Sequence, residues 1–217
     1  LFADESRALN PGFHARAERG WPWVRLKLAA SLDGRTAMAS GESNWITGAS
    51  ARSDVQHWRA RSSVIVTGAG TVRQDDPRMD VRPGELPDDA KRAHTEPVLQ
   101  PERIVVSSQP RLPQSARIAT GGGPLSVCAS RPPSPEERAA LEALGAGWLA
   151  VPAGDAARPD IPSLLAKLGE SEHNEVFVEC GATLAGAFLR AGRVDEWLVY
   201  TAPCVMGHDA RPLVHLS

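Results

Sequence analysis

Lysine is scarce in this sequence, which has only three lysines, Lys27, Lys91 and Lys167, among its 24 basic residues. An excess of charge of either sign is also missing, because those 24 basic residues are balanced by 26 acidic ones and the formal net charge is −2. A balance this close to neutral excludes a generally basic nucleic-acid-binding protein. It still allows a local basic pocket that binds a phosphorylated small molecule.

Cysteine is also rare, and the number of cysteines is odd: Cys128, Cys180 and Cys204 each lie in or beside an apolar run. This usage predicts reduced, structural thiols rather than a disulfide framework. Apolar runs as long as the roughly 20 residues of a membrane span are missing, and the first residues do not resemble a signal peptide. We therefore expect a soluble, cytoplasmic protein with no membrane or nucleic-acid partner.

Several motifs of known chemistries are absent as well. Pro203-Cys204 lacks the second cysteine of the P-C-x-x-C half of a zinc-deaminase signature,. The sequence contains no G-x-S-x-G elbow, no G-x-x-x-x-G-K-[ST] loop and no G-x-G-x-x-G fingerprint,. Its six histidines form no pair at ligand spacing,. These absences disfavour a hydrolase, a kinase or a metalloenzyme, and we expect no metal site.

Alternating helix and strand signals run through the rest of the chain. The first residues predict one helix from about Glu5 to Arg19, which ends at Gly20 before a Trp-Pro-Trp sequence,. Residues 24–31 alternate apolar and polar side chains, which predicts a strand with Lys27 on its polar face,. Further strands are expected near 64–66, 103–107, 125–129, 147–151, 175–179 and 195–201, and further helices near 49–61, 134–144, 162–170 and 183–191.

Two helix starts carry capping signals, Thr47 or Ser50 for the helix at 49–61 and a Ser134–Glu137 capping box for the helix at 134–144,. Residues 83–102 are proline-rich, charged and aperiodic, so we expect a surface excursion there,. Strands that are unbroken apolar runs and alternate with helices predict an α/β fold with a largely parallel sheet.

A few polar residues are candidates for a site, each with an ordinary alternative. Residues 179–183 (ECGAT) join a predicted strand to a predicted helix, where ligands collect and helix amides attract phosphate,; the alternative is a plain turn. Lys27 is either a site residue or the solvated side of an edge strand. Arg59, Arg61 and Arg82 carry guanidinium groups suited to a phosphate, although most arginines are surface residues.

Four longer motifs occur in order along the chain: KLAASLDGRTA at 27–37, GESNWIT at 41–47, TVRQDDP at 71–77 and VECGATLAG at 178–186. Together they resemble the reductase half of the bifunctional riboflavin-biosynthesis deaminase–reductase family, over about residues 5–213. Residues 6–13 (SRALNPGF) resemble the join at the end of that family's deaminase domain.

The resemblance implies a dihydrofolate-reductase-like fold, with a mixed, largely parallel central sheet flanked by helices. It implies hydride transfer from NADPH that reduces the ribosyl group of 5-amino-6-(5-phosphoribosylamino)uracil to ribitylamino, in riboflavin biosynthesis. Residues 1–20 are then a linker helix and residues 21–217 the reductase domain. We also expect a homodimer, fusion to a zinc deaminase domain in the full-length protein, and a closing piece of the sheet that lies beyond Ser217.

The resemblance also assigns roles to individual residues. The expected catalytic residues are Lys27 and Glu179. The expected contacts to the substrate are Ser43, Arg59, Met79, Arg82 and again Glu179. The expected contacts to NADPH are Ala29, Trp45, Thr71, Asp75, Ser108, Gly181, Ala182, Thr183, Leu184, Ala185, Gly186 and Ala187. The alternatives are a pterin reductase of the same fold and a non-catalytic nucleotide-binding relative, and the sequence leaves the choice between NADPH and NADH open.

Overall fold

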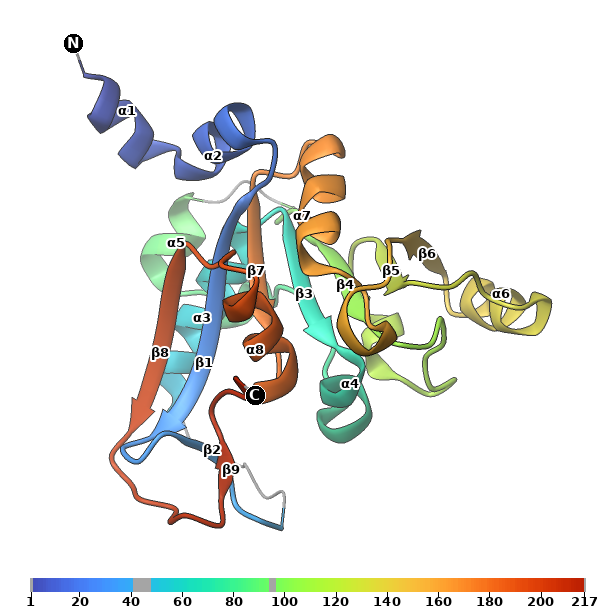
Figure 1. The fold of residues 1–217 in the computed structure, drawn as a ribbon. Coiled ribbons are helices and arrows are strands. Elements are labelled where there is room, and N and C mark those ends of the chain that lie inside the picture. Colours follow the sequence, from blue (N-terminus) through green and yellow to red (C-terminus); the bar gives the residue numbers. More distant parts are fainter. Residues whose placement is uncertain (1, 41–47, 94–96, 217) are drawn as a thin grey trace.

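The computed structural model of this chain describes residues 2–40, 48–93 and 97–216 (Figure 1). Its longer strands are β1 (Trp23–Ser31), β3 (Val64–Gly68), β4 (Glu102–Val106), β5 (Leu125–Ala129), β6 (Ala146–Ala150), β7 (Glu175–Glu179) and β8 (Glu196–Ala202). Its α-helices are α1 (Ala3–Leu9), α2 (Pro11–Arg19), α3 (Ala49–Arg61), α4 (Ala69–Asp75), α5 (Asp88–Ala93), α6 (Pro135–Ala143), α7 (Ile161–Glu170) and α8 (Ala182–Arg190).

Seven strands form one sheet in the order β6-β5-β4-β3-β7-β1-β8. Each neighbouring pair of these strands is parallel. A separate antiparallel pair, β2 (Arg35–Ala37) with β9 (Arg211–Pro212), lies beyond the carboxyl ends of β1 and β8 (Figure 1). The predicted α/β fold with a largely parallel sheet is therefore confirmed.

Helices cover both faces of the sheet, which explains why its strands are continuous apolar runs. Helices α7 and α8 lie on one side of the sheet (Figure 1). They bury Leu164, Leu165 and Phe188 in one cluster with every second residue of β1, β3 and β7. The opposite face packs Ile65 and Phe177 against α3, α4 and α6. The carboxyl ends of all seven strands meet at one edge, where ligands bind in open α/β sheets.

The amino-terminal segment differs from the expected single helix. Two helices, α1 and α2, replace it, with Asn10 between them in a non-helical conformation (φ −134°, ψ 60°). Pro11 causes the break, because a proline disfavours the helical conformation of the residue before it. Helix α2 ends as predicted at Gly20, which has a φ of 83°. It docks on the domain through Gly12, where a Cβ would lie 2.6 Å from the Asn174 carbonyl oxygen.

The predicted helix caps and the predicted surface excursion agree with the structure to different degrees. The capping box of α6 is confirmed, since the Ser134 side chain accepts from the Glu137 amide and the Glu137 carboxylate accepts from the Ser134 amide. Ser50 is not the cap of α3: it lies inside the helix, Gly48 takes the cap position, and Thr47 is outside the described residues. The stretch 83–102 is more structured than expected, because α5 and a 3-10 turn, Pro83–Glu85, bury Leu86 and Ala90.

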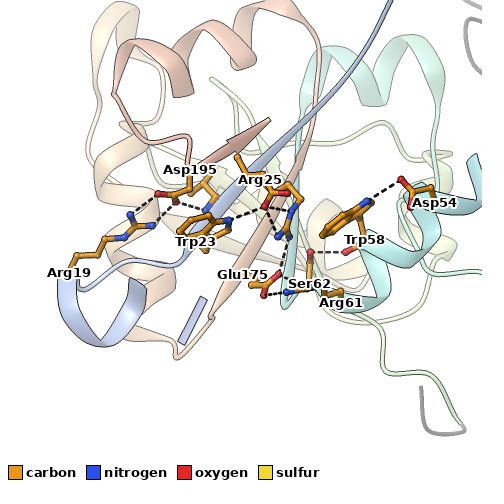
Figure 2. A network of polar contacts seen from close by, with 11 residues as sticks. Arg19, Trp23, Arg25, Asp54, Trp58, Arg61, Ser62, Glu175 and Asp195 are labelled. Atoms are coloured by element: carbon orange, nitrogen blue, oxygen red, sulfur yellow. Dashed lines mark hydrogen bonds and ion pairs between the residues drawn. The ribbon is translucent and has the colours of Figure 1, made fainter. Parts of the chain in front are cut away.

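A buried network of charges holds β1 between its two neighbours (Figure 2). Arg25, 2% exposed, pairs with the Glu175 carboxylate of β7 at 2.9 Å and with the Glu196 carboxylate of β8 at 2.8 Å. Its guanidinium carbon also lies 4.1 Å from the centre of the Trp58 ring of α3. Glu175 accepts a second ion pair from Arg61. The positive charge of Arg25 is thus compensated by carboxylates, as a buried cation requires,.

Candidate active site

Neighbouring positions on the adjacent strands β1 and β7 bring the predicted catalytic residues together. Lys27 of β1 is in register with Glu179, the last residue of β7. Helix α3 crosses the same face of the sheet and adds Arg59, whose Nε donates to Glu179 Oε1 at 2.6 Å and whose Nη2 donates to Oε2 at 3.1 Å. The side chains of this bidentate pair are 10% and 9% exposed.

Arg59 is held on its remaining side as well. Its Nη1 donates to the Asp80 carbonyl oxygen at 3.0 Å, and its Nη2 lies 3.6 Å from Met79 Sδ. Burial works against the charge of Glu179, but the attraction and hydrogen bonds of Arg59 outweigh it and lower the pKa of Glu179. Burial works against Arg59 too, and the Glu179 charge raises its pKa. Both groups are therefore charged. The Arg59 guanidinium, which was predicted to bind the substrate phosphate, is hydrogen-bonded to Glu179.

Lys27 stands in contrast to Arg25, two residues earlier on the same face of β1. Within the described part of the chain, the Lys27 ammonium forms no hydrogen bond or ion pair; its Nζ lies 5.7 Å from the centre of the Tyr200 ring. The Tyr200 hydroxyl donates to Asp54 Oδ2 at 2.6 Å. Burial and this hydrogen bond to a carboxylate raise the pKa of Tyr200, so the phenol is neutral. Within this cluster of described residues, Lys27 is the cation whose hydrogen-bond donors are still available.

The segment after α4 forms another wall of the site. Met79 is buried with a φ of 53°, in the left-handed region that methionine seldom adopts,. Two buried or half-buried amides fix the next residues: Gln56 accepts from the Arg82 amide at 2.9 Å, and Gln100 both accepts from and donates to the Val81 backbone at 2.9 Å. This bracing of a strained segment is typical of functional sites.

A hollow of about 520 Å³ lies between α3 and this segment. Arg82, predicted to bind the substrate, lines it and is paired with Glu85 at 2.9 Å. Arg52 and Ser53 also line the hollow, and neither was singled out from the sequence. The signal for Arg52 was its spacing, because it precedes Arg59 by seven residues and so lies on the same face of the predicted helix.

The predicted dinucleotide residues meet at the start of α8. Gly181 caps this nine-residue helix without a side-chain bond to its first amides. Among the described residues, the only heavy atom within 4 Å of a Cβ built on Gly181 is Thr71 Oγ1, at 3.9 Å. Open space therefore faces uncapped helix amides beside a hydroxyl. This geometry fits the pyrophosphate of a dinucleotide.

The other predicted cofactor residues occupy varied environments. Ala29 is half-buried on β1, Ser108 is exposed after β4, and Asp75 is exposed at the end of α4. Burial raises the pKa of Asp75. Further along α8, Ala182, Thr183, Leu184 and Ala187 keep some exposure, whereas Ala185 and Gly186 are buried.

Ser43 and Trp45 lie outside the described residues. Within the described ranges, no three histidine, cysteine, aspartate or glutamate side chains come together as metal ligands would. In the same part of the chain, no helix has both the length and the apolar character to cross a membrane.

The fold and the site together define a class: an α/β domain with a parallel sheet that carries a Lys-Glu-Arg cluster and, at its carboxyl edge, the uncapped first turn of a helix. Comparison with protein families narrows this class. The family model described as the RibD C-terminal domain matches residues 22–217, and the chain belongs to this family.

Relatives with curated names agree with this membership. The riboflavin biosynthesis protein RibD of Escherichia coli K12 is 43% identical over 217 residues, covering 100% of this chain and 58% of its own length. The chain thus spans little more than half of that relative. A shorter relative from Buchnera aphidicola (strain APS), named 5-amino-6-(5-phosphoribosylamino)uracil reductase, is 33% identical over 180 residues, 81% of this chain and 83% of its own.

Solved structures show the same fold. Acinetobacter baumannii RibD (form 1) superposes with a TM-score of 0.79 at 39% identity, covering 97% of this chain and 54% of its own. The riboflavin biosynthesis reductase Rib7 of Saccharomyces cerevisiae covers 96% of this chain and 87% of its own, with a TM-score of 0.67. At 18% identity that second likeness concerns the fold alone. The predicted reductase fold class is confirmed.

Proposed function

We propose that this chain reduces the ribosyl group of 5-amino-6-(5-phosphoribosylamino)uracil to a ribitylamino group, with a nicotinamide dinucleotide as the reductant, in riboflavin biosynthesis. The observation that carries the proposal is Lys27, which forms no ion pair within 4 Å with any described residue and lies in register with the Arg59-bound Glu179, on the sheet whose carboxyl edge also carries the first turn of α8. The name of the Buchnera reductase, 83% of whose length the match covers, supports the same reaction.

The chemistry accounts for the two catalytic groups. The substrate sugar must open from its ring, so that the ring oxygen takes up a proton and carbon C1′ becomes an imine. The dinucleotide, when bound, supplies the hydride that this carbon accepts. Lys27 is the acid that provides the proton at the imine nitrogen or the sugar oxygen, and Glu179 orients the sugar hydroxyls through its lone pairs. The protein also aligns the two reacting carbons.

The contacts of Arg59 suggest that the arginines of the site have different roles. Arg59 holds Glu179 ionised and in one orientation, so we assign it a positioning role beside its predicted contact with the substrate. Arg82 and Arg52 line the hollow next to α3 and are suited to the substrate phosphate,. Met79 backs Arg59 on that side.

NADPH is our proposal for the dinucleotide. The first turn of α8 would hold its pyrophosphate, with Thr71 beside it, and Ala29, Trp45, Asp75 and Ser108 would contact the rest. For the whole protein we propose a fused zinc deaminase domain, homodimer formation and a cytoplasmic location, with residues 1–20 as the link between the domains. The greater length of the E. coli relative supports the fusion.

The test is the loss of nicotinamide absorbance when this chain is mixed with NADPH and the phosphoribosylamino substrate. We expect turnover that needs both compounds, and no turnover with dihydrofolate in place of the substrate. Oxidation of NADPH by dihydrofolate alone would favour the pterin reductase. Saturable binding of NADPH without turnover on either compound would favour a non-catalytic relative.

A further inference from the structure

Tyr200, the only tyrosine of the sequence, lies beside Lys27 and has no role in the reaction described above. It belongs to β8, where Leu198 is in register with Lys27 and Tyr200 with Ala29. Partners in register on parallel strands point to the same face of a sheet, so the Tyr200 ring projects on the Lys27 side. The Lys27 Nζ lies 5.7 Å from the centre of that ring, within the roughly 6 Å over which an aromatic face attracts a cation,.

The hydroxyl end of the ring is fixed by α3. The Tyr200 hydroxyl donates to Asp54 Oδ2 at 2.6 Å, a bond that joins residues 146 positions apart. The same oxygen accepts from Trp58 Nε1 at 3.2 Å, in a bond drawn in Figure 2. Both donors are neutral side chains, so neither of them cancels the charge of Asp54. A short hydrogen bond to an ionised acceptor is stronger than one between neutral groups, and it holds the ring in place.

The electrostatics of the cluster define what Tyr200 contributes. Burial, the hydrogen bond to Asp54 and the charges of Asp54 and Glu179 all raise the pKa of Tyr200. Burial works against the Glu179 charge, but Arg59 and, more weakly, Lys27 outweigh it and lower the pKa of Glu179. Tyr200 is therefore a neutral phenol whose proton is held by Asp54, and it is neither acid nor base in the reaction. It offers Lys27 the ring face, whose electron density increases when the hydroxyl donates to a carboxylate.

We propose that Tyr200 is a positioning residue: its ring, held by Asp54, keeps the Lys27 ammonium where it donates the proton to the substrate. The inference rests on the proposed function, in which Lys27 is the acid. A lysine side chain is flexible and populates many rotamers unless a contact selects among them. Lys27 forms no ion pair with any described residue. An attractive ring on one side limits its rotamers and, unlike a carboxylate, leaves its N–H donors available.

Kinetic variants test the role of the ring. Tyr200→Leu removes the ring and should lower kcat about 3- to 30-fold, the range expected for loss of one cation–π contact. Its KM should change less than about twofold, because a misplaced acid weakens the transition state and not substrate binding. Tyr200→Phe keeps the ring and should retain most of the kcat. Asp54→Ala, which frees the hydroxyl and also keeps the ring, should fall between the two.

The matched control is Trp197→Leu, since the chain has no second tyrosine. Trp197 is an aromatic residue of the same strand, but it is 47% exposed and in register with Leu26, on the opposite face of the sheet. This variant also loses a ring from β8 and should keep the kcat and KM of the unmodified chain. Melting temperatures show whether each variant is folded.

A double variant separates positioning of Lys27 from a structural role. If Tyr200 acts through Lys27, Tyr200→Leu costs no further activity in a chain that already carries Lys27→Met. A structural role would lower the residual turnover of Lys27→Met by the same factor as that of the unmodified chain.

NMR tests the contact without turnover. The sequence has three lysines, and Lys91 and Lys167 are exposed, so a chain grown with isotope-labelled lysine gives a simple set of ε-methylene signals. The ring of Tyr200 should shift the Lys27 signal away from the other two, and Lys27→Met identifies it by its loss. Tyr200→Leu should remove the shift, whereas Tyr200→Phe should keep it.

Two outcomes would overturn the inference and leave the proposed reaction standing. One is turnover of the phosphoribosylamino substrate by the unmodified chain and, with the same kcat, by Tyr200→Leu. The other is an equal loss of kcat from Tyr200→Leu with and without Lys27, which would make the ring structural. Absence of turnover by the unmodified chain would overturn the proposed function together with the inference.

Discussion

Replacing Arg59 by methionine should destabilise the fold strongly and in a pH-dependent way. The substitution keeps an unbranched side chain next to Met79 but leaves the Glu179 carboxylate buried without its cation. Breaking a buried ion pair from one side costs about 3–5 kcal/mol. Both partners are about nine-tenths buried, so the pair is shielded from the solvent screening that weakens surface ion pairs,. For a domain of this size the loss corresponds to a fall in melting temperature of about 6–20 °C.

The pH dependence follows from the direction of each pKa shift. In the unmodified protein the pKa of Glu179 is lowered, so its stabilising effect is complete above the unfolded pKa of about 4.3 and is lost as the pH falls below it,. In Arg59→Met, burial acts without the cation and raises the pKa of Glu179. The carboxyl then takes up a proton on folding, and the variant gains stability as the pH falls. The difference in free energy of unfolding between the unmodified protein and Arg59→Met should therefore become smaller as the pH falls from about 8 to about 5.

Urea unfolding of both proteins across that pH range measures the effect. Arg61→Met is the matched control, because Arg61 lies on the same helix, is 39% exposed and pairs with Glu175 at 3.4 Å. An exposed pair contributes about 0–1 kcal/mol. Adding Glu179→Gln to Arg59→Met should recover part of the loss. A penalty for Arg59→Met no larger than that of Arg61→Met, and constant with pH, would refute this account of the pair.

Three further predictions concern single side chains. Lys27→Met should lower kcat by about 10²–10⁴-fold, as expected for loss of a catalytic acid, with little change in melting temperature. Arg82→Ala should raise KM and leave kcat nearly unchanged, because a phosphate contact binds ground and transition states alike. A thiol reagent should label the exposed Cys204 in the folded protein and Cys128 only after unfolding, because burial raises the pKa of Cys128 to about 12.

Steady-state kinetics, melting curves and mass spectrometry of the labelled protein check these three expectations in turn. A stability loss in Lys27→Met that matches its loss of activity would make that lysine structural. An unchanged KM in Arg82→Ala would remove it from the phosphate site. Labelling of Cys128 in the native state would contradict its burial in the core.

The strands were predictable because their signal is local. Residues 125–129 and 175–179 form strands at the predicted bounds, since both are short apolar runs between turn residues,. The break at Asn10–Pro11 also has a local signal, the proline itself. The prediction of a single helix there was wrong because it gave helix periodicity more weight than Pro11,. Helix α4, with two glycines next to or within its first turn, carries too weak a signal to be found in this way,.

The site was less predictable, because its groups meet only through the fold. Glu179 and Arg59 are 120 positions apart, and no periodicity links them. Family motifs singled out both residues, but as separate contacts with the substrate. Their mutual bond depends on how α3 crosses the sheet, which local patterns do not encode.

The comparison of Arg25 with Lys27 shows which information comes from the structure and not from the alternating sequence pattern of a strand. Alternation places both cations on the same face of β1, and either could have been the functional one. Arg25 is paired because Glu175 and Glu196 flank it on both neighbouring strands. Lys27 has Glu179 on one side and Leu198 on the other, and Arg59 already occupies that carboxylate. Among the described residues, Lys27 therefore forms no ion pair, and its ammonium is available to a substrate. The assignment of Lys27 as the acid thus depends on the bond between Arg59 and Glu179.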